Sequence, residues 1–207
     1  MRFQILATLL AAPLTLAGCG GGSVFDPPIT AQMPNVAADS GYAYASGSFY
    51  TTDSGYPIRL GDIGTNVQRR GLLRFNLASI PAGATIEDAE LRIGQYNITG
   101  NPYGTLGDVT VDHVAMGVAF DGPDFSGGTL ASNIGILSTA SSLEEKSLNV
   151  TQRVIDDLNA GRSTTDFRLR FQLATDSDGA IDAAELNNAF DIGANGQIPR
   201  LIVRYRD

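Results

Sequence analysis

Acidic residues near the C-terminal end of the chain have the spacing of a calcium-binding loop. They match ligand positions 3, 5, 9 and 12 of a twelve-residue loop, in which oxygen atoms hold the ion. These residues are Asp176, Asp178, Asp182 and Glu185. Gly179 stands at the sharp turn of such a loop, but Ala174 occupies the first ligand position and the preceding segment has strand periodicity. We therefore expect no EF-hand, and two interpretations stay open: weak calcium binding, or a solvated acidic turn.

Arginines on alternating segments form a second candidate site. Side chains alternate between the two faces of a strand, so arginines between apolar residues should point away from the core. These arginines are Arg74, Arg92, Arg168 and Arg170. On a shared sheet they would form an exposed stripe that binds the carboxylate or sulfate groups of an acidic polysaccharide. The favoured alternative is that they pair with Glu90 and other acids on neighbouring strands.

Aromatic residues are densest between residues 42 and 56. The cluster consists of Tyr42, Tyr44, Phe49, Tyr50 and Tyr56. A tyrosine ring stacks on a sugar while its hydroxyl group forms hydrogen bonds, so Tyr42, Tyr44 and Tyr50 are candidate sugar-binding residues. The favoured alternative places these rings in the core or on a strand face.

Little in the sequence supports catalysis. His113 is the only histidine and stands at the end of a predicted strand, so we interpret it as structural. The sequence has no nucleophile elbow or phosphate-binding loop. Adjacent acids such as Glu144 and Glu145 diverge on a strand or a helix, which suits a solvated face better than a shared substrate. We therefore expect a non-enzymatic protein.

Short alternating segments dominate the region after residue 36. Apolar and polar residues alternate at 74–77, 89–93, 109–111, 167–173 and 201–205, which predicts half-buried strands. Many short strands with Gly-rich turns predict an all-β, antiparallel β-sandwich. The predicted core contains Phe75, Leu77, Leu91, Ile93, Leu169, Phe171, Leu201 and Val203.

One segment has helical rather than strand periodicity. Thr151 is a candidate N-cap, and Val154, Ile155 and Leu158 fall on one side of the helix that follows it. Gly161 is placed to end this helix, because glycine adopts the left-handed conformation readily. We expect this single short α-helix, together with a turn near residues 183–189.

The N-terminus has the pattern of a secretory signal. Arg2 and an apolar stretch precede Leu16-Ala17-Gly18-Cys19, and the stretch is shorter than the about 20 residues of a membrane-spanning helix. The pattern resembles a bacterial lipobox, in which the chain is cut before the cysteine and Cys19 is lipidated. It predicts a signal peptide at 1–18, a flexible tether at 19–35 and one domain at 36–207. The alternative is an ordinary signal peptide with a stray cysteine.

The amino-acid composition and Gly20 limit which binding partners and which cellular location we expect for the protein. The net charge of −8 argues against nucleic acid and against a broad contact with anionic lipids, so we expect membrane contact through the N-terminal lipid only. Hydrophobic residues make up 43% of the chain, which is typical of a globular protein. Gly20 follows the cysteine, and in the lipoprotein pattern this favours the outer membrane or the cell surface.

Three segments resemble a known family. Residues 70–93, from Arg70-Gly71-Leu72-Leu73-Arg74 to Ile93, are similar to the central motif of DNRLRE-type domains of bacterial surface proteins. Residues 148–161 and 199–205 resemble the family's later segments. The resemblance implies a jelly-roll sandwich similar to carbohydrate-binding modules associated with alginate and other algal polysaccharides. This chain lacks tryptophan, so a sugar-binding surface would use tyrosine or phenylalanine.

Three hypotheses for function follow from these patterns. The first is a lipid-anchored, non-catalytic envelope domain that binds polysaccharide, acidic chains included, with calcium as a candidate cofactor. The second is a structural or assembly lipoprotein that contacts another envelope protein. The third is a polysaccharide-processing enzyme whose carboxylates come together only on folding.

Overall fold

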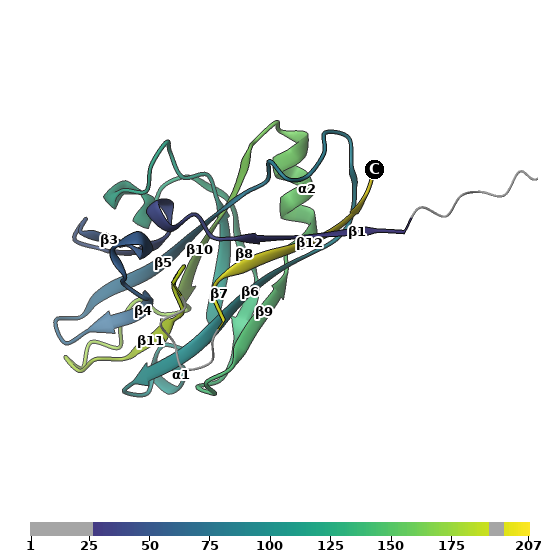
Figure 1. Ribbon diagram of the computed structural model, residues 1–207. Helices are drawn as coiled ribbons and strands as arrows, with labels where there is room; N and C mark the ends of the chain where they lie inside the picture. Colours follow the sequence, from purple (N-terminus) through teal and green to yellow (C-terminus); the bar gives the residue numbers. More distant parts are fainter. Residues whose placement is uncertain (1–26, 191–196) are drawn as a thin grey trace, which may run out of the picture.

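The computed structural model describes residues 27–190 and 197–207, and most of its regular secondary structure consists of antiparallel strands (Figure 1). The strands are β1 (Ile29–Pro34), β2 (Gly41–Tyr44), β3 (Phe49–Thr51), β4 (Ile58–Ile63), β5 (Val67–Asn76), β6 (Thr85–Thr99), β7 (Val109–Val114), β8 (Thr129–Ser138), β9 (Glu145–Asn149), β10 (Thr164–Phe171), β11 (Ala183–Leu186) and β12 (Arg200–Arg206). The predicted fold class, an all-β antiparallel sandwich, is confirmed. Cys19 and the predicted signal peptide lie outside the described residues.

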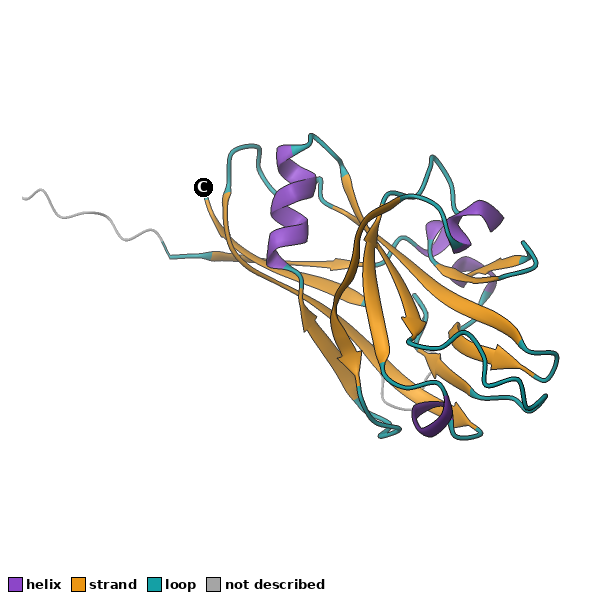
Figure 2. Ribbon diagram, turned by 180° about the vertical axis from the view of Figure 1, so that it is seen from behind, coloured by secondary structure: helices purple, strands orange, loops and turns teal. Residues whose placement is uncertain are grey.

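The strands form one curled sheet that folds into two facing layers (Figure 2). Its order is β1-β12-β6-β11-β4-β5-β10-β7-β8, the hairpin β2–β3 is added to β5, and β9 is added to β6. Strand β6 joins the layers, because its first part pairs with β12 and β9 and its last part pairs with β11. The layers therefore enclose the core from both sides.

The eight predicted core residues are all buried, each at most 2% exposed. They join one apolar cluster between the layers, which also includes Phe167 from β10 and Val154 from the helix α2 (Thr151–Asn159). The period-two prediction of strand register is thus confirmed, since a shift by one residue would expose the whole set.

The predicted helix is confirmed as α2, and Gly161 follows it at φ +71°. The predicted N-cap is wrong by one residue: Val150 is the N-cap, and Thr151 is the first residue of the helix, with its amide donating a hydrogen bond to Asn149 Oδ1. A second helix, α1 (Pro102–Thr105), is a single turn, and three short 3₁₀ helices are η1 (Ala37–Asp39), η2 (Thr52–Ser54) and η3 (Gly122–Phe125). In the described part of the chain, no helix has the length and apolar character needed to cross a membrane.

Two expectations about connecting segments are wrong. The tether was expected to extend to residue 35, but β1 occupies residues 29–34 and pairs with β12 along its whole length. Pro34 is compatible with this strand because it lies at the end of an edge strand, where no ladder donor is required. The expected turn at 183–189 begins instead with β11, which pairs with both β4 and β6.

The outer face of the β5–β10–β7 region is covered as well. The hairpin β2–β3 and the segment from 115 to 128, which contains η3, lie over it and form a small apolar cluster. Its members are Ala43, Leu72, Val114, Met116 and Phe120. Every residue of β7 is consequently buried. Polar side chains on this outer face must therefore find partners inside the protein.

Candidate functional site

Arg74 lies inside the protein rather than on an exposed stripe. It stands directly opposite Asp166 across the β5–β10 pair, and its Nε and Nη2 atoms donate to the two Asp166 oxygens at 2.8 and 2.9 Å. Nη2 also donates to the carbonyl oxygens of Met116 and Gly117 in the covering segment. Hydrogen bonds to Asp166 are the chief cause that raises the pKa of Arg74. Its donors are thus occupied by the protein.

Arg168 and Arg170 share one carboxylate, that of Asp112. Arg168 is 3% exposed, faces Asp112 across the β10–β7 pair, and places Nη2 3.1 Å from Asp112 Oδ2. Arg170 Nε lies 3.2 Å from the same oxygen. Burial acts to raise the pKa of Asp112, but the Asn133 amide and both guanidinium groups outweigh it and hold the pKa below its usual value.

Arg92 lies in the other part of the sheet and pairs with Glu90 at 2.6 Å and with Glu145 at 3.3 Å. The hypothesis of one exposed stripe is therefore wrong for these arginines. The favoured alternative, pairing with acids on the same and neighbouring strands, is confirmed. The physical reason is the second covering layer, which buries Arg74 and Arg168 and leaves their charges to be neutralised internally.

Four tyrosines form a continuous surface that we call the tyrosine surface: Tyr42 and Tyr44 on β2, Tyr50 on β3, and Tyr56 before β4. Tyr42 and Tyr50 face each other across the hairpin, and their rings stack at 5.2 Å with an interplanar angle of 17°. Tyr50 meets Tyr44 and Tyr56 edge to face at 6.0 and 5.2 Å. The predicted tyrosines are thus brought together.

The members of the tyrosine surface differ in exposure. Tyr50 and Tyr56 are 38% and 40% exposed, whereas Tyr42 is 1% exposed. Tyr42 therefore supports the other rings and is not itself available to stack on a sugar. Burial raises the pKa of Tyr42 to about 12, although the charge of Arg59 acts to lower it. Its hydroxyl group stays protonated under ordinary conditions.

Arg59 on β4 supports the tyrosine surface and was not identified from the sequence. Its guanidinium lies 5.6 Å from the centre of the Tyr42 ring, and Nη1 donates to the Tyr42 hydroxyl at 3.3 Å. Nε donates to Glu185 at 2.8 Å, and Glu185 also accepts from Asn97 at 3.0 Å. Glu185 therefore belongs to this network. The sequence could have indicated Arg59, because this residue lies between the apolar residues Ile58 and Leu60.

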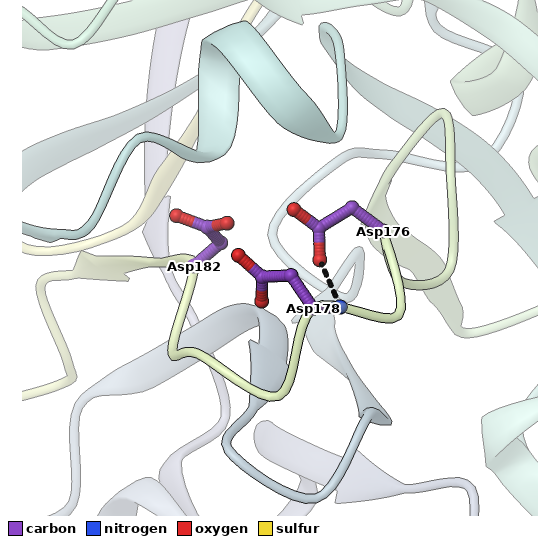
Figure 3. Close-up of side chains that lie close together, drawn as sticks. All are labelled: Asp176, Asp178 and Asp182. Carbon is purple, nitrogen blue, oxygen red and sulfur yellow. Dashed lines mark hydrogen bonds between the residues drawn. The ribbon is translucent and has the colours of Figure 1, made fainter.

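Three of the four predicted metal ligands come together in the connection between β10 and β11 (Figure 3). Oxygen atoms of Asp176, Asp178 and Asp182 lie within 4.8 Å of one another, close enough to hold one metal ion. The prediction that Glu185 is the fourth is wrong. The chain enters β11 at Ala183, and Glu185 is directed at Arg59 instead.

Local hydrogen bonds shape this acidic cluster. The Asp178 amide donates to Asp176 Oδ1 at 3.2 Å, and the Ala180 amide donates to Asp178 Oδ1 at 2.6 Å. Asp182 is 4% exposed, and the Thr105 hydroxyl donates to its Oδ2 at 2.9 Å. The loop and α1 thereby orient the carboxylates.

His113 joins the sheet to α2. Its Nε2 atom lies 3.0 and 2.9 Å from the two oxygens of Asp157, which also accepts from Arg162. His113 and Asp157 are each 1% exposed. The pair therefore fixes the helix against β7 and does not face solvent, as the structural interpretation of His113 requires.

Comparison with models of known protein families finds no match, and comparison with curated proteins finds none. The resemblance of residues 70–93 to DNRLRE-type domains therefore stays a prediction from the sequence.

Proposed function

We propose that the chain is a non-catalytic domain, lipid-anchored in the bacterial envelope, that binds polysaccharide at the tyrosine surface. One observation carries this proposal: Tyr44, Tyr50 and Tyr56 form a continuous edge-to-face cluster in which two rings are more than one third exposed. A gathered set of exposed rings is more informative than scattered apolar residues. The predicted lipidation at Cys19 supplies the anchor at the outer membrane or cell surface.

The rings are held in place before a ligand arrives. Tyr42 stacks under Tyr50, and Arg59 fixes the Tyr42 hydroxyl. Holding a binding surface in its bound conformation reduces the entropy lost on binding. Tyrosine presents a flat apolar face and a hydroxyl group together, which suits the apolar faces and hydroxyl groups of a sugar.

The internal pairing of the arginines bears on the kind of polysaccharide. The guanidinium groups of Arg74 and Arg168 are buried against aspartates, so little of their charge is available to an acidic chain. The net charge of −8 also opposes a negatively charged ligand. Recognition through tyrosine rings therefore extends to neutral polysaccharides and is insensitive to salt.

Replacing Tyr50 by Ala should weaken polysaccharide binding about tenfold or more, because it removes the ring that contacts the other three members of the surface. A glycan array identifies the ligand, and titration at low and high salt gives the affinities. The control is Arg170→Ala, which leaves Asp112 paired with Arg168 and should bind as the wild type does. If only Arg170→Ala lost binding, the arginines would be the site. If the wild type bound no glycan, contact with another envelope protein would be the better hypothesis.

We propose Ca²⁺ as the ion that the acidic cluster takes, since this ion prefers several carboxylate and carbonyl oxygens in a flexible arrangement. At about ten times its Kd, calcium should stabilise the fold by about 1.4 kcal/mol, which is about 3–6 °C in Tm. Asp178→Asn should remove most of this shift. Glu185→Gln is the matched control and should keep it, because Glu185 pairs with Arg59. An equal Tm with calcium and with chelator would exclude the site.

A further inference from the structure

A buried carboxylate with an unused oxygen lies against the acidic cluster. Asp62 on β4 is 0% exposed. The Asp182 amide donates to Asp62 Oδ1 at 3.1 Å, and the Asp62 amide donates to the Asp182 carbonyl at 2.9 Å. The side chain of Asp62 is therefore directed at the loop. Its Oδ2 atom is buried and has no hydrogen-bond partner among the described residues.

Most buried aspartates elsewhere in the described chain have a counter-charge. Asp112, Asp157 and Asp166 each lie against an arginine, whereas Asp124 caps η3 and accepts the Asp121 amide. In contrast, none of the four acids Asp62, Asp176, Asp178 and Asp182 forms an ion pair with any basic residue of the described chain. A buried carboxylate without a counter-charge is strongly unfavourable, so this arrangement points to a cation from solution.

We propose that Asp62 is the fourth carboxylate of the cation site, in the place that sequence spacing assigned to Glu185. It anchors Asp182 through the loop amide and supplies a buried negative charge and a free oxygen to water bound to the ion, since among the described acids only Asp176, Asp178 and Asp182 lie close enough together to contact one ion directly. The ligand class is a hard divalent cation that prefers oxygen. This inference rests on the calcium proposal above.

The test is the Ca²⁺ affinity of the full-length protein, purified in detergent and freed of divalent ions, by isothermal titration calorimetry. Asp62→Asn keeps the shape of the side chain and an oxygen for the Asp182 amide, but it removes the charge. We expect its calcium affinity to fall about 10–100-fold. In chelator its Tm should equal or exceed that of the wild type, because the unpaired charge is gone. The control is Asp53→Asn, an exposed acid on η2, which should bind calcium normally.

The titrations distinguish calcium binding by the acidic cluster from the contribution of Asp62 to that binding. Calcium binding by the wild type with unchanged affinity in Asp62→Asn would overturn the role of Asp62 and leave the calcium proposal in place. Absence of calcium binding by the wild type would overturn both. If Asp62→Asn does not fold in chelator, the calcium affinity of Asp62→Ser is measured instead. The same fall in affinity is expected, since this variant also removes the charge and fills less space.

Discussion

Replacing Phe75 or Phe171 by Ala is expected to lower the free energy of unfolding by about 3–5 kcal/mol. Both rings are 0% exposed. The Phe75 ring lies 6.3 Å from that of Phe167, and the Phe171 ring lies 5.3 Å from that of Tyr103. Either change removes contacts within the main apolar cluster and leaves a cavity. Since domains are commonly stable by only about 5–15 kcal/mol, either variant should be near the limit of folding.

Equilibrium unfolding in urea, followed by circular dichroism, measures this loss. Leu143→Ala is the control, because that side chain is 58% exposed and its loss should change stability by at most about 0.5 kcal/mol. A loss below about 1 kcal/mol for either phenylalanine would contradict the core described above.

Asp166→Ala should destabilise the protein by about 3–5 kcal/mol, because it leaves the buried Arg74 guanidinium without its main partner. The two side chains are only 4% and 7% exposed, and they share two hydrogen bonds. Asp166 also accepts the Met116 amide at 2.9 Å, so the covering segment should loosen as well. The half-exposed Arg92 offers the comparison, and Arg92→Ala should cost at most about 1 kcal/mol.

A variant that lacks both charges separates the effect of the ion pair from that of the packing around it. Arg74→Met combined with Asp166→Leu removes both charges, and this variant should be more stable than Asp166→Ala alone. If Asp166→Ala unfolded at the same urea concentration as the wild type, Arg74 would not depend on Asp166 and an exposed arginine would again be the better interpretation.

The sequence predicted the inner faces of β5, β6, β10 and β12 but not what covers the outer face of the sheet. Alternation places Phe75 and Phe171 inside, because a strand buried on one face has period two. The burial of Arg74 depends on the segment 115–128, which has no regular pattern and lies far away in the sequence. The same applies to β1, because the prolines at 27, 28 and 34 indicate a linker and only the pairing with β12 shows a strand.

For the candidate sites, too, the sequence predicted the residues that are close in the chain and missed those that only the fold brings together. The tyrosines could be predicted because they are neighbours in sequence, joined by one short hairpin. The acidic loop was predicted in part, since Asp176, Asp178 and Asp182 are also local. Glu185 was assigned by the spacing of a helical motif, whereas here the chain becomes a strand at Ala183. Asp62 could not be found from the sequence, because tertiary pairing alone brings β4 to the loop.

Tyrosine fluorescence during a polysaccharide titration tests the central claim most directly. The chain has no tryptophan and 7 tyrosines, and four of these form the tyrosine surface, so their emission reports on it. The wild type should show a saturable change in emission with the polysaccharide identified by the array, in low and in high salt. The Tyr50→Ala/Tyr56→Ala variant should fold normally, because both rings are exposed, and should show no such change. Binding of equal affinity by the wild type and this variant would contradict the account.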